Sequence, residues 1–237
     1  MNTIINQTHG PYRFGSSQNL TDEHLTQLTS VFKTSTQAQN KELEGRVSAS
    51  TLRLKGIGPV IVKHYRRGGL LGRFVKRTYL RCGNPRCQAE YAQLENARGL
   101  GINAPEPIAY AYKGYLFYQA WLITREIINQ QSLASLSSLD PERAEAAKKL
   151  LLKQILLLQD KHIFHTDLHP GNVLVDDNDR VFIIDFDKAV NYKGTKDQLQ
   201  MQYYKRWNRA VSKHRLPEIL YINRQPSHCS TAFNPYK

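Results

Sequence analysis

The chain has 237 residues, of which 41% are hydrophobic, and carries a formal net charge of +13 at neutral pH. This length and apolar content allow a sizeable core, in one domain or two lobes, and exclude a largely disordered protein. The excess of lysine and arginine over acidic residues indicates an anionic partner, such as nucleic acid, an acidic membrane surface or a phosphorylated substrate.

The cysteine content and the pattern of hydrophobic residues further limit the class of protein and the compartment in which it is expected. The three cysteines include no Cys-x-x-Cys pair, so they indicate neither a disulfide framework nor a zinc site, and a reducing cytoplasm is expected. The first residues lack the basic-then-apolar pattern of a signal peptide. No apolar run approaches the ~20 residues that span a bilayer. We therefore expect a soluble or peripheral protein.

The first 44 residues are polar, and residues 1–44 are expected to be an N-terminal extension that packs on the lobes. Within this region Leu25, Leu28 and Phe32 recur at helical spacing. The spacing predicts an amphipathic helix over residues 21–32, to which we assign only a packing role.

A predicted N-lobe, residues 45–125, begins with a strand-like pattern. Residues 50–55 alternate, a turn follows, and residues 60–65 return, which predicts a β-hairpin. The second strand carries Lys63 near its end, and a charge on a buried strand is costly unless it meets an anion. Lys63 is therefore our candidate for binding the α- and β-phosphates of ATP, as the Val-Ala-Ile-Lys lysine does in kinases. The alternative is an edge-strand lysine that reaches water.

Two further candidates flank this hairpin. The segment before it holds a single glycine, Gly45, and lacks a glycine-rich fingerprint, so Gly45 is only a weak match to a loop that covers phosphates. After it, a helix is predicted over residues 85–98 and carries Glu90, the candidate partner of Lys63. Glu95 is the second choice because sequence patterns leave helix register open by a few residues. The alternative for either glutamate is a surface position.

Residues 66–81 interleave arginine and lysine with leucine, phenylalanine and valine. This mixture suits an anionic lipid surface, where each charge contributes on the order of 1 kcal/mol. It equally suits phosphates on a glycolipid acceptor. A solvated connector and nucleic-acid binding remain alternatives, although no recognised nucleic-acid motif accompanies the charge.

A second hairpin is predicted from residues 108–112 and 115–124, with its turn at residues 113–114. Its aromatic density indicates sheet packing rather than a base-stacking surface. Thr124 and Glu126 lie where this hairpin leads into the second lobe. Backbone groups of this connection are candidate contacts for adenine.

The predicted C-lobe comprises residues 126–222, and residues 223–237 are expected to form a loose tail. A helix is predicted from Pro141 to about Asp160, because proline suits the first turn of a helix and a leucine-rich run follows. A further helix with basic flanks is expected over about 203–216.

The strongest signal is the order His-x-Asp-x-x-x-x-Asn, an apolar hairpin and Asp-Phe. The polar turn at residues 176–180 separates two apolar runs and predicts a tight β-hairpin. This order is typical of a phosphotransferase catalytic loop followed by a metal-binding aspartate. Asp167 is the candidate base that accepts the proton of the acceptor hydroxyl, and Asn172 and Asp185 offer the hard oxygen ligands that Mg²⁺ prefers. The alternative is a polar hairpin whose side chains cap turns.

These motifs resemble the protein-kinase-like superfamily, and more closely its bacterial lipopolysaccharide kinase branch, which acts on Kdo (3-deoxy-D-manno-octulosonic acid) and heptose. The resemblance covers roughly residues 45–215 and is carried by residues 62–70, 165–172 and 184–188. It implies an α+β, two-lobed fold, with an antiparallel β-sheet N-lobe and a mainly helical C-lobe. Asp187 replaces the glycine that follows Asp-Phe in protein kinases, which argues against a protein-kinase-style activation switch.

The resemblance implies phosphorylation of an inner-core lipopolysaccharide sugar with ATP and Mg²⁺, with Kdo on a lipid A precursor as the first choice and heptose as the second. The expected partners are that Kdo- or heptose-bearing precursor and the anionic cytoplasmic face of the bacterial inner membrane, with no nucleic acid. Two other hypotheses stay open. One is a phosphotransferase for a soluble metabolite or a protein, and the other is a non-catalytic anion-binding module, such as a pseudokinase or a charge-driven nucleic-acid binder.

Overall fold

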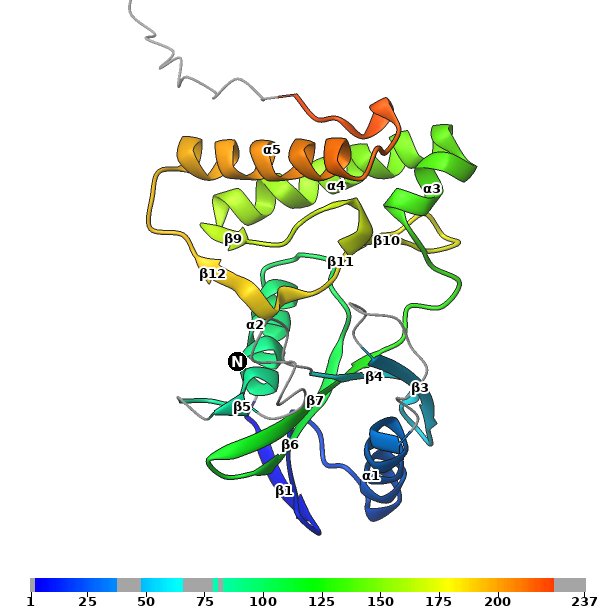
Figure 1. Ribbon diagram of the computed structural model, residues 1–237, viewed down its shortest axis with the longest axis vertical. Coiled ribbons are helices and arrows are strands. Elements are labelled where there is room, and N and C mark those ends of the chain that lie inside the picture. Colours follow the sequence, from blue (N-terminus) through cyan, green and yellow to red (C-terminus); the bar gives the residue numbers. More distant parts are fainter. Residues whose placement is uncertain (1–2, 38–47, 66–78, 81–82, 224–237) are drawn as a thin grey trace, which may run out of the picture. The chain divides into compact units, whose positions relative to one another are not determined.

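The computed structural model describes residues 3–37, 48–65, 79–80 and 83–223. The chain divides into two compact units, unit 1 with Met1–Gln130 and Phe182–Lys188, and unit 2 with Gln131–Val181 and Ala189–Lys237. Helices and strands occur in both, and the paired strands run antiparallel (Figure 1). The expected α+β fold with antiparallel sheets is therefore confirmed.

Unit 1 is built on a seven-stranded sheet in which β1-β2-β6-β7-β4-β3 are neighbours and β5 pairs with β7. The strands are β1 (Ile5–His9), β2 (Tyr12–Ser16), β3 (Ser48–Leu54), β4 (Gly58–His64), β5 (Tyr79–Leu80), β6 (Pro107–Gly114) and β7 (Phe117–Arg125). The β3–β4 and β6–β7 hairpins are both confirmed. In the second, the bend lies at residues 115–116 rather than at the predicted 113–114.

The polar N-terminal region contributes two strands that the sequence did not predict. β1 pairs with β2, and β2 pairs with β6, so residues 5–16 extend the sheet instead of forming an extension over it. Gly15 allows β2 to approach the ring of Tyr110, because a Cβ atom at Gly15 would lie 2.2 Å from that ring. A side chain at this position would force the Tyr110 ring to move.

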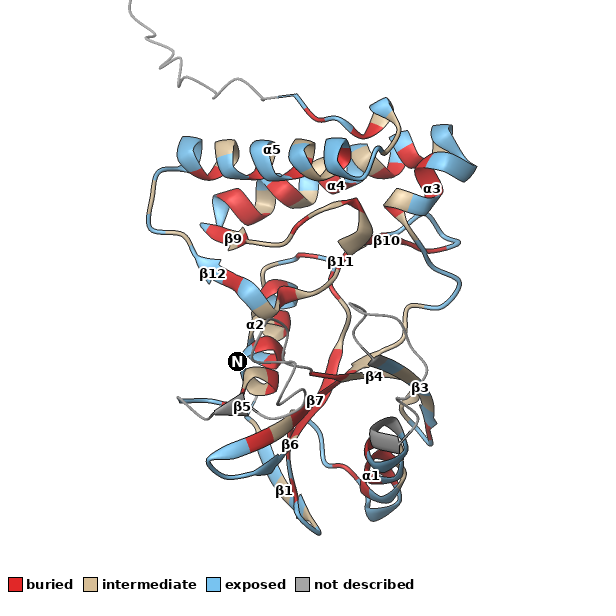
Figure 2. Cartoon of the chain, viewed as in Figure 1, coloured by how far each residue is buried: buried red, intermediate tan, exposed pale blue. Residues whose placement is uncertain are grey.

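α1 (Asp22–Gln37) packs on one face of this sheet. Leu25, Leu28 and Phe32 are buried, as their helical spacing predicted (Figure 2). The Phe32 ring stacks on Trp121 of β7 with centroids 4.4 Å apart, and Trp121 stacks on His64 of β4 at 5.0 Å. These stacked rings lie in the hydrophobic core of unit 1, between the sheet and α1.

α2 (Arg86–Gly99) confirms the helix predicted over residues 85–98 and packs on the opposite face. Its Tyr91 ring meets Tyr110 of β6 with centroids 5.4 Å apart. Successive residues of a strand point to opposite faces of a sheet. Since His64 stacks on Trp121 on the α1 face, Lys63 faces α2.

Unit 2 holds three α-helices within the described part of the chain, namely α3 (Leu133–Leu139), α4 (Pro141–Asp160) and α5 (Lys196–Lys213). α4 begins where the sequence predicted, because the Asp140 side chain accepts a hydrogen bond from the Arg143 N–H at 3.1 Å and Pro141 occupies the first helical position. α5 begins with a capping box between Thr195 and Gln198. Among the described residues, no helix combines the length and the apolar composition that crossing a membrane requires.

α4 and α5 pack against each other, and each has a buried face, shown in red in Figure 2. On α5 the buried residues are four apart: Leu199, Tyr203, Trp207 and Val211. Trp207 Nε1 also donates to the Leu220 carbonyl at 2.6 Å and ties the helix to the 3₁₀ turn η4 (Glu218–Leu220).

Short strands and 3₁₀ turns connect the helices of unit 2. They are β8 (Gln131–Ser132), β9 (Ile163–His165), η2 (Pro170–Asn172), β10 (Val173–Val175), and β12 (Ala189–Asn191). β10 pairs with β8, and β12 pairs with β9. β11 (Val181–Ile183) follows β10 after the predicted tight turn at residues 176–180, which is confirmed. η3 (Phe186–Lys188), counted with unit 1, follows β11.

Candidate active site

Lys63 lies at the centre of an ion-pair cluster on the α2 face of unit 1. Its Nζ atom is 2.9 Å from both carboxylate oxygens of Glu90 on α2 and 2.6 Å from Oδ1 of Asp185. The strand alternation that buries Val62 on one face turns Lys63 to the other, where α2 supplies Glu90. Glu95, the second choice from the sequence, is not the glutamate that contacts Lys63.

Glu90 is buried, with only 2% of its side chain exposed. A buried carboxylate is costly unless its charge is paired and its oxygens accept hydrogen bonds. Lys63 supplies the charge, and the Tyr65 hydroxyl donates a further hydrogen bond to Oε2. Burial first, and then the neighbouring Glu90 carboxylate, raise the pKa of Tyr65 well above its usual value. Tyr65 therefore stays a neutral donor that fixes Glu90 toward Lys63.

Asp185 adopts a backbone conformation that few residues tolerate. Its φ is +66°, in the left-handed region, where aspartate is among the better accepted side chains. Phe186, fully buried in η3, anchors the turn that follows. Backbone conformations of this kind concentrate at functional sites, since the surrounding structure must hold them.

Three carboxylates gather here, because oxygens of Glu90, Asp185 and Asp187 all lie within 4.8 Å of one another. Arg86, the first residue of α2, pairs with Asp187, whose side chain is only 6% exposed. Asp185 is the most accessible of the three, with 29% of its side chain exposed. Carboxylate oxygens are the hard ligands that Mg²⁺ selects, so the donor set suits such an ion.

The predicted catalytic loop occupies unit 2 and runs from β9 to η2. His165 is buried at the end of β9, and its Nδ1 accepts a hydrogen bond from the Asp167 N–H at 3.3 Å. The backbone N–H of His165 donates to the Tyr203 hydroxyl of α5 at 2.9 Å, and that hydroxyl donates to the Ile163 carbonyl at 2.8 Å. Burial raises the pKa of Tyr203 far above its usual value, which keeps the hydroxyl protonated for this role.

Asn172 closes the same loop. Its Nδ2 donates to the Asp167 carbonyl at 2.9 Å, which links the two ends of the His-x-Asp-x-x-x-x-Asn motif. His169 caps η2 between them, since its Nδ1 accepts from the Gly171 N–H at 3.1 Å. The amide nitrogen of Asn172 is only a donor, so its side-chain oxygen is the atom suited to a metal ligand, and the hydrogen bond within the loop fixes the orientation of the amide.

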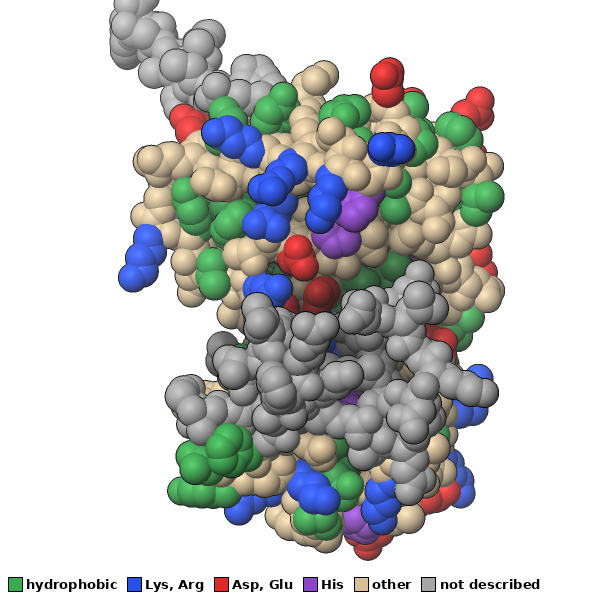
Figure 3. Space-filling model, viewed as in Figure 1, with side chains coloured by type: hydrophobic (Ala, Val, Ile, Leu, Met, Phe, Trp, Pro, Cys, Tyr) green, Lys and Arg blue, Asp and Glu red, His purple; other side chains and the backbone are tan. Residues whose placement is uncertain are grey.

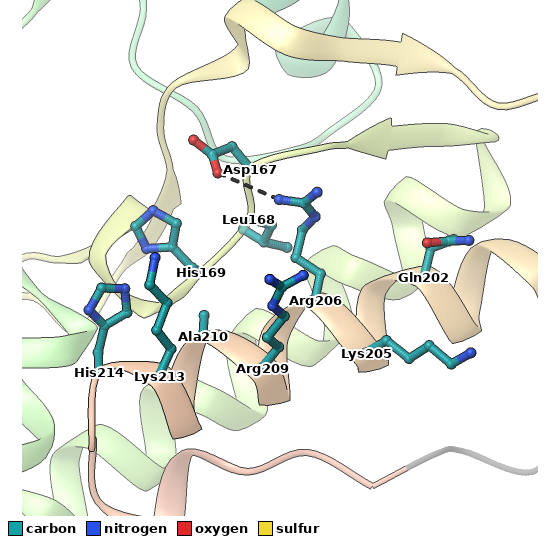
Figure 4. Close-up of a pocket in the computed structure, with 10 residues that line it drawn as sticks. All are labelled: Asp167, Leu168, His169, Gln202, Lys205, Arg206, Arg209, Ala210, Lys213 and His214. Carbon is teal, nitrogen blue, oxygen red and sulfur yellow. Dashed lines mark ion pairs between the residues drawn. The ribbon is translucent and has the colours of Figure 1, made fainter. Parts of the chain in front are cut away.

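Asp167 itself faces a strongly basic helix face. Oδ1 of Asp167, whose side chain is 37% exposed, lies 3.6 Å from Nη1 of Arg206 on α5. A pocket of about 500 Å³ lies beside this pair, between the loop at Asp167 to His169 and the α5 side chains of Arg206, Arg209 and Lys213 (Figure 4). A carboxylate and several cations therefore line one pocket.

Three further residues, Gly45, Thr124 and Glu126, were predicted to contact the nucleotide. Gly45 lies outside the described residues, as does the basic segment at residues 66–81 except for its last strand, β5. Thr124 lies near the end of β7 in the central part of the sheet. The N–H of Glu126 donates to the Pro59 carbonyl at 3.0 Å, so the Glu126 carbonyl is the better candidate for an adenine contact.

Sequence reasoning missed Tyr65, Arg86 and the basic face of α5. A signal for Tyr65 existed, because residues two apart on a strand share a face and Lys63 was already a candidate. For α5 the signal was the four-residue spacing of Lys205, Arg209 and Lys213. Arg86 offered no local signal, since its partner is 101 residues away.

The sequence of the chain is similar to that of known proteins. A model of the lipopolysaccharide kinase (Kdo/WaaP) family matches residues 31–218. A 3-deoxy-D-manno-octulosonic acid kinase of Vibrio vulnificus (strain YJ016) is 35% identical over 191 residues, which are 78% of this chain and 79% of the relative. The protein of that name from Vibrio cholerae serotype O1 is 35% identical over 155 residues, 64% of this chain and 65% of the relative.

A more distant relative of the same name, from Xylella fastidiosa (strain M12), is 26% identical over 143 residues, 59% of this chain and 57% of the relative. The family model spans most of the chain, and the resemblance stated from the motifs is confirmed. A kinase family implies the use of ATP and typically of a divalent metal ion. The chain belongs to the lipopolysaccharide kinase (Kdo/WaaP) family.

Proposed function

We propose that this chain transfers the γ-phosphoryl group of ATP to a hydroxyl of Kdo on a lipid A precursor. Family membership supports the kinase reaction, and the Vibrio relatives are named as kinases of that sugar acid. The observation that carries the proposal is the pairing of one lysine with two carboxylates, Lys63 with Glu90 and Asp185. The corresponding fold is a protein-kinase-like one with two lobes.

At the nucleotide end, Lys63 binds the α- and β-phosphates. Its side chain is 18% exposed, so the ammonium keeps a route to a ligand while Glu90 and Tyr65 fix its position. A lysine held in this way neutralises phosphate charge without losing side-chain freedom when the nucleotide binds.

Asp185 and Asn172 are the proposed ligands of the divalent ion, most simply Mg²⁺, because each offers a side-chain oxygen. Glu90 is less suitable because Lys63 and Tyr65 engage both of its oxygens, and Asp187 because its side chain is only 6% exposed, against 29% for Asp185, whose Oδ1 contacts Lys63. When bound, the ion neutralises charge on the transferred phosphoryl group.

At the acceptor end, Asp167 accepts the proton of the attacking sugar hydroxyl. The bond from that oxygen to the γ-phosphorus forms as the bond from the γ-phosphorus to ADP breaks, and ADP leaves with the electron pair. Arg206 holds the Asp167 carboxylate from one side, which makes it a positioning residue.

A peripheral position on the cytoplasmic face of the inner membrane would bring the enzyme to its lipid. Its net charge of +13 supports attraction to anionic lipids. The tip of the β6–β7 hairpin adds an apolar element, since Tyr115, Leu116 and Phe117 are 76%, 56% and 57% exposed. Aromatic and leucine side chains of this kind partition into the membrane interface.

An acceptor panel tests the proposal. The purified chain is incubated with labelled ATP, Mg²⁺ and one of three lipids: a Kdo-bearing lipid A precursor, a heptosylated acceptor, and the same lipid without either sugar. We expect label only on the Kdo-bearing lipid. Label that requires heptose would assign the enzyme to heptose instead, and equal labelling without any core sugar would contradict the proposal.

A further inference from the structure

Basic side chains predominate on the α5 side of the Asp167 pocket, where Gln202 and Ala210 are the other α5 residues that line it. An α-helix turns by about 100° per residue, so Lys205, Arg209 and Lys213 form one stripe and Arg206 lies beside it. Figure 4 shows Arg206, Arg209 and Lys213 pointing from α5 toward the loop at Asp167 and His169, with Lys205 extending away from Asp167 and His214 directly after the helix. In the space-filling view, Lys and Arg side chains gather next to histidines on this part of unit 2 (Figure 3).

Among the described residues, only one of these four cations has an acidic partner. Within the described part of the chain, Lys205, Arg209 and Lys213 make no ion pair, and Arg206 pairs with Asp167. Asp167 is also the one acidic residue among the described side chains that line the pocket. Like charges held this close repel one another, and a bound anion relieves that repulsion.

The volume and composition of the pocket limit what that anion can be. About 500 Å³ is within the range of small-molecule sites and holds a sugar residue. An anionic group bound by Arg209 or Lys213 shares the pocket with Asp167, so it belongs to the sugar that is phosphorylated or to its immediate neighbour. A guanidinium and an ammonium both bind carboxylate through charge-assisted hydrogen bonds.

We propose that Arg209 and Lys213 bind the carboxylate of an acidic sugar acceptor and so place its hydroxyl at Asp167. The inference rests on the proposed function and adds the group by which the acceptor is selected. Arg206 pairs with Asp167 and so offsets the repulsion between the acceptor carboxylate and Asp167.

The test compares two proteins, wild type and a variant, on two acceptors that differ only in the sugar carboxylate. Arg209→Gln with Lys213→Gln is compared with wild type on the Kdo-bearing lipid and on the same lipid with its sugar carboxylate converted to a methyl ester. On the acid we expect kcat/KM to fall by about 100-fold, mainly through KM, because two charge-assisted contacts are lost. On the ester the variant and wild type should differ by less than about threefold, because the contact is already absent.

Lys153→Gln provides the matched control, because Lys153 is an exposed cation on α4 that does not line the pocket. It should leave kcat/KM for the acid unchanged, and the double variant should leave KM for ATP unchanged. An equal loss on acid and ester would overturn the proposal. So would a loss that disappears when the lipid phosphates, rather than the sugar carboxylate, are removed.

A direct binding measurement separates this inference from the proposed function. If wild type phosphorylates none of the lipids, the proposed function fails, and calorimetric titration with free Kdo decides the pocket alone. Binding to wild type that weakens at least tenfold in Arg209→Gln with Lys213→Gln supports the carboxylate subsite. Equal binding to both proteins, or none to wild type, overturns it.

Discussion

The Nζ atom of Lys63 lies 2.9 Å from both carboxylate oxygens of Glu90, a side chain that is almost completely buried. Removing one partner of a buried ion pair typically costs roughly 3–5 kcal/mol. Glu90→Gln keeps the shape and leaves Asp185 beside the lysine, so we expect a loss of unfolding free energy at the lower end of that range. We also expect kcat/KM for ATP to fall about tenfold or more, because Lys63 is held less firmly.

Chemical denaturation and initial rates at varied ATP measure these two effects. Glu95→Gln, on the same helix, is the matched control and should change both by much less. Wild-type stability together with wild-type ATP kinetics in Glu90→Gln would show that the pairing has neither role.

Tyr65 makes the stability of unit 1 sensitive to alkaline pH. Its pKa in the folded protein is raised above the ordinary 10.0, so the stabilisation is complete below that value and is lost as pH rises through the folded pKa. Tyr65→Phe removes the donor to Glu90 and should cost about 1–3 kcal/mol near neutral pH. The difference from wild type should shrink above pH 10. Tyr115→Phe, at an exposed position, should behave like wild type throughout.

Asp176 stabilises the β10–β11 turn. Its Oδ1 accepts from the N–H groups of Asn178 and Arg180 at 3.0 and 2.9 Å, and Oδ2 accepts from the Arg180 side chain at 2.8 Å. Asp176→Ala leaves these donors without an acceptor and should cost about 2–3 kcal/mol. Asp177→Ala, at the exposed neighbouring position, should cost less than about 0.5 kcal/mol.

The cost of Asp176→Ala should also depend on acid pH. Burial raises the pKa of Asp176, but hydrogen bonds from Arg180 and Asn178 outweigh it and bring the pKa below the ordinary 3.8. The stabilisation is therefore present above pH 3.8 and is lost as pH falls through the folded pKa. Urea denaturation at several pH values checks this, and a cost that stays constant down to pH 2 would contradict it.

The exposed tip of the β6–β7 hairpin should contribute to membrane attachment. Leu116→Asp with Phe117→Asp places charge where the proposed interface needs apolar surface, and we expect co-sedimentation with anionic vesicles to fall several-fold. The matched change Leu139→Asp, at another exposed leucine, should have a smaller effect. Equal loss from the two variants would point to charge alone rather than to insertion of the tip.

Local sequence patterns predicted most helices and hairpins of the fold. The helical spacing of Leu25, Leu28 and Phe32 predicted α1, Pro141 before a leucine-rich run predicted α4, and alternation on both sides of a turn predicted the β3–β4 hairpin. β1 was missed because an edge strand buries little: residues 5 to 9 are all exposed or intermediate. β2 is a short strand in which buried Tyr12 and Phe14 alternate with exposed Arg13, and its pairing with β1 and β6 places it inside the sheet.

In the candidate site too, residues that belong to a local sequence pattern were predicted, and contacts between distant segments were missed. Motif order alone pointed to Asp167, Asn172 and Asp185, and the lysine strand with its helix pointed to Lys63 and Glu90. Contacts made by distant segments, such as Arg86 with Asp187, leave no local pattern. The basic pocket likewise depends on the packing of α5 against the loop at Asp167, which helical spacing cannot supply.

Single-turnover transfer by Asp167→Asn tests the central claim most directly. The variant keeps the size of the side chain and its neighbour Arg206 but removes the proton acceptor, so we expect the rate of phosphoryl transfer to the Kdo-bearing lipid to fall by about 10²- to 10⁴-fold. The dissociation constant for ATP should stay within about twofold of wild type. Transfer at a near-wild-type rate with ATP bound normally would contradict the assignment of Asp167 as the base.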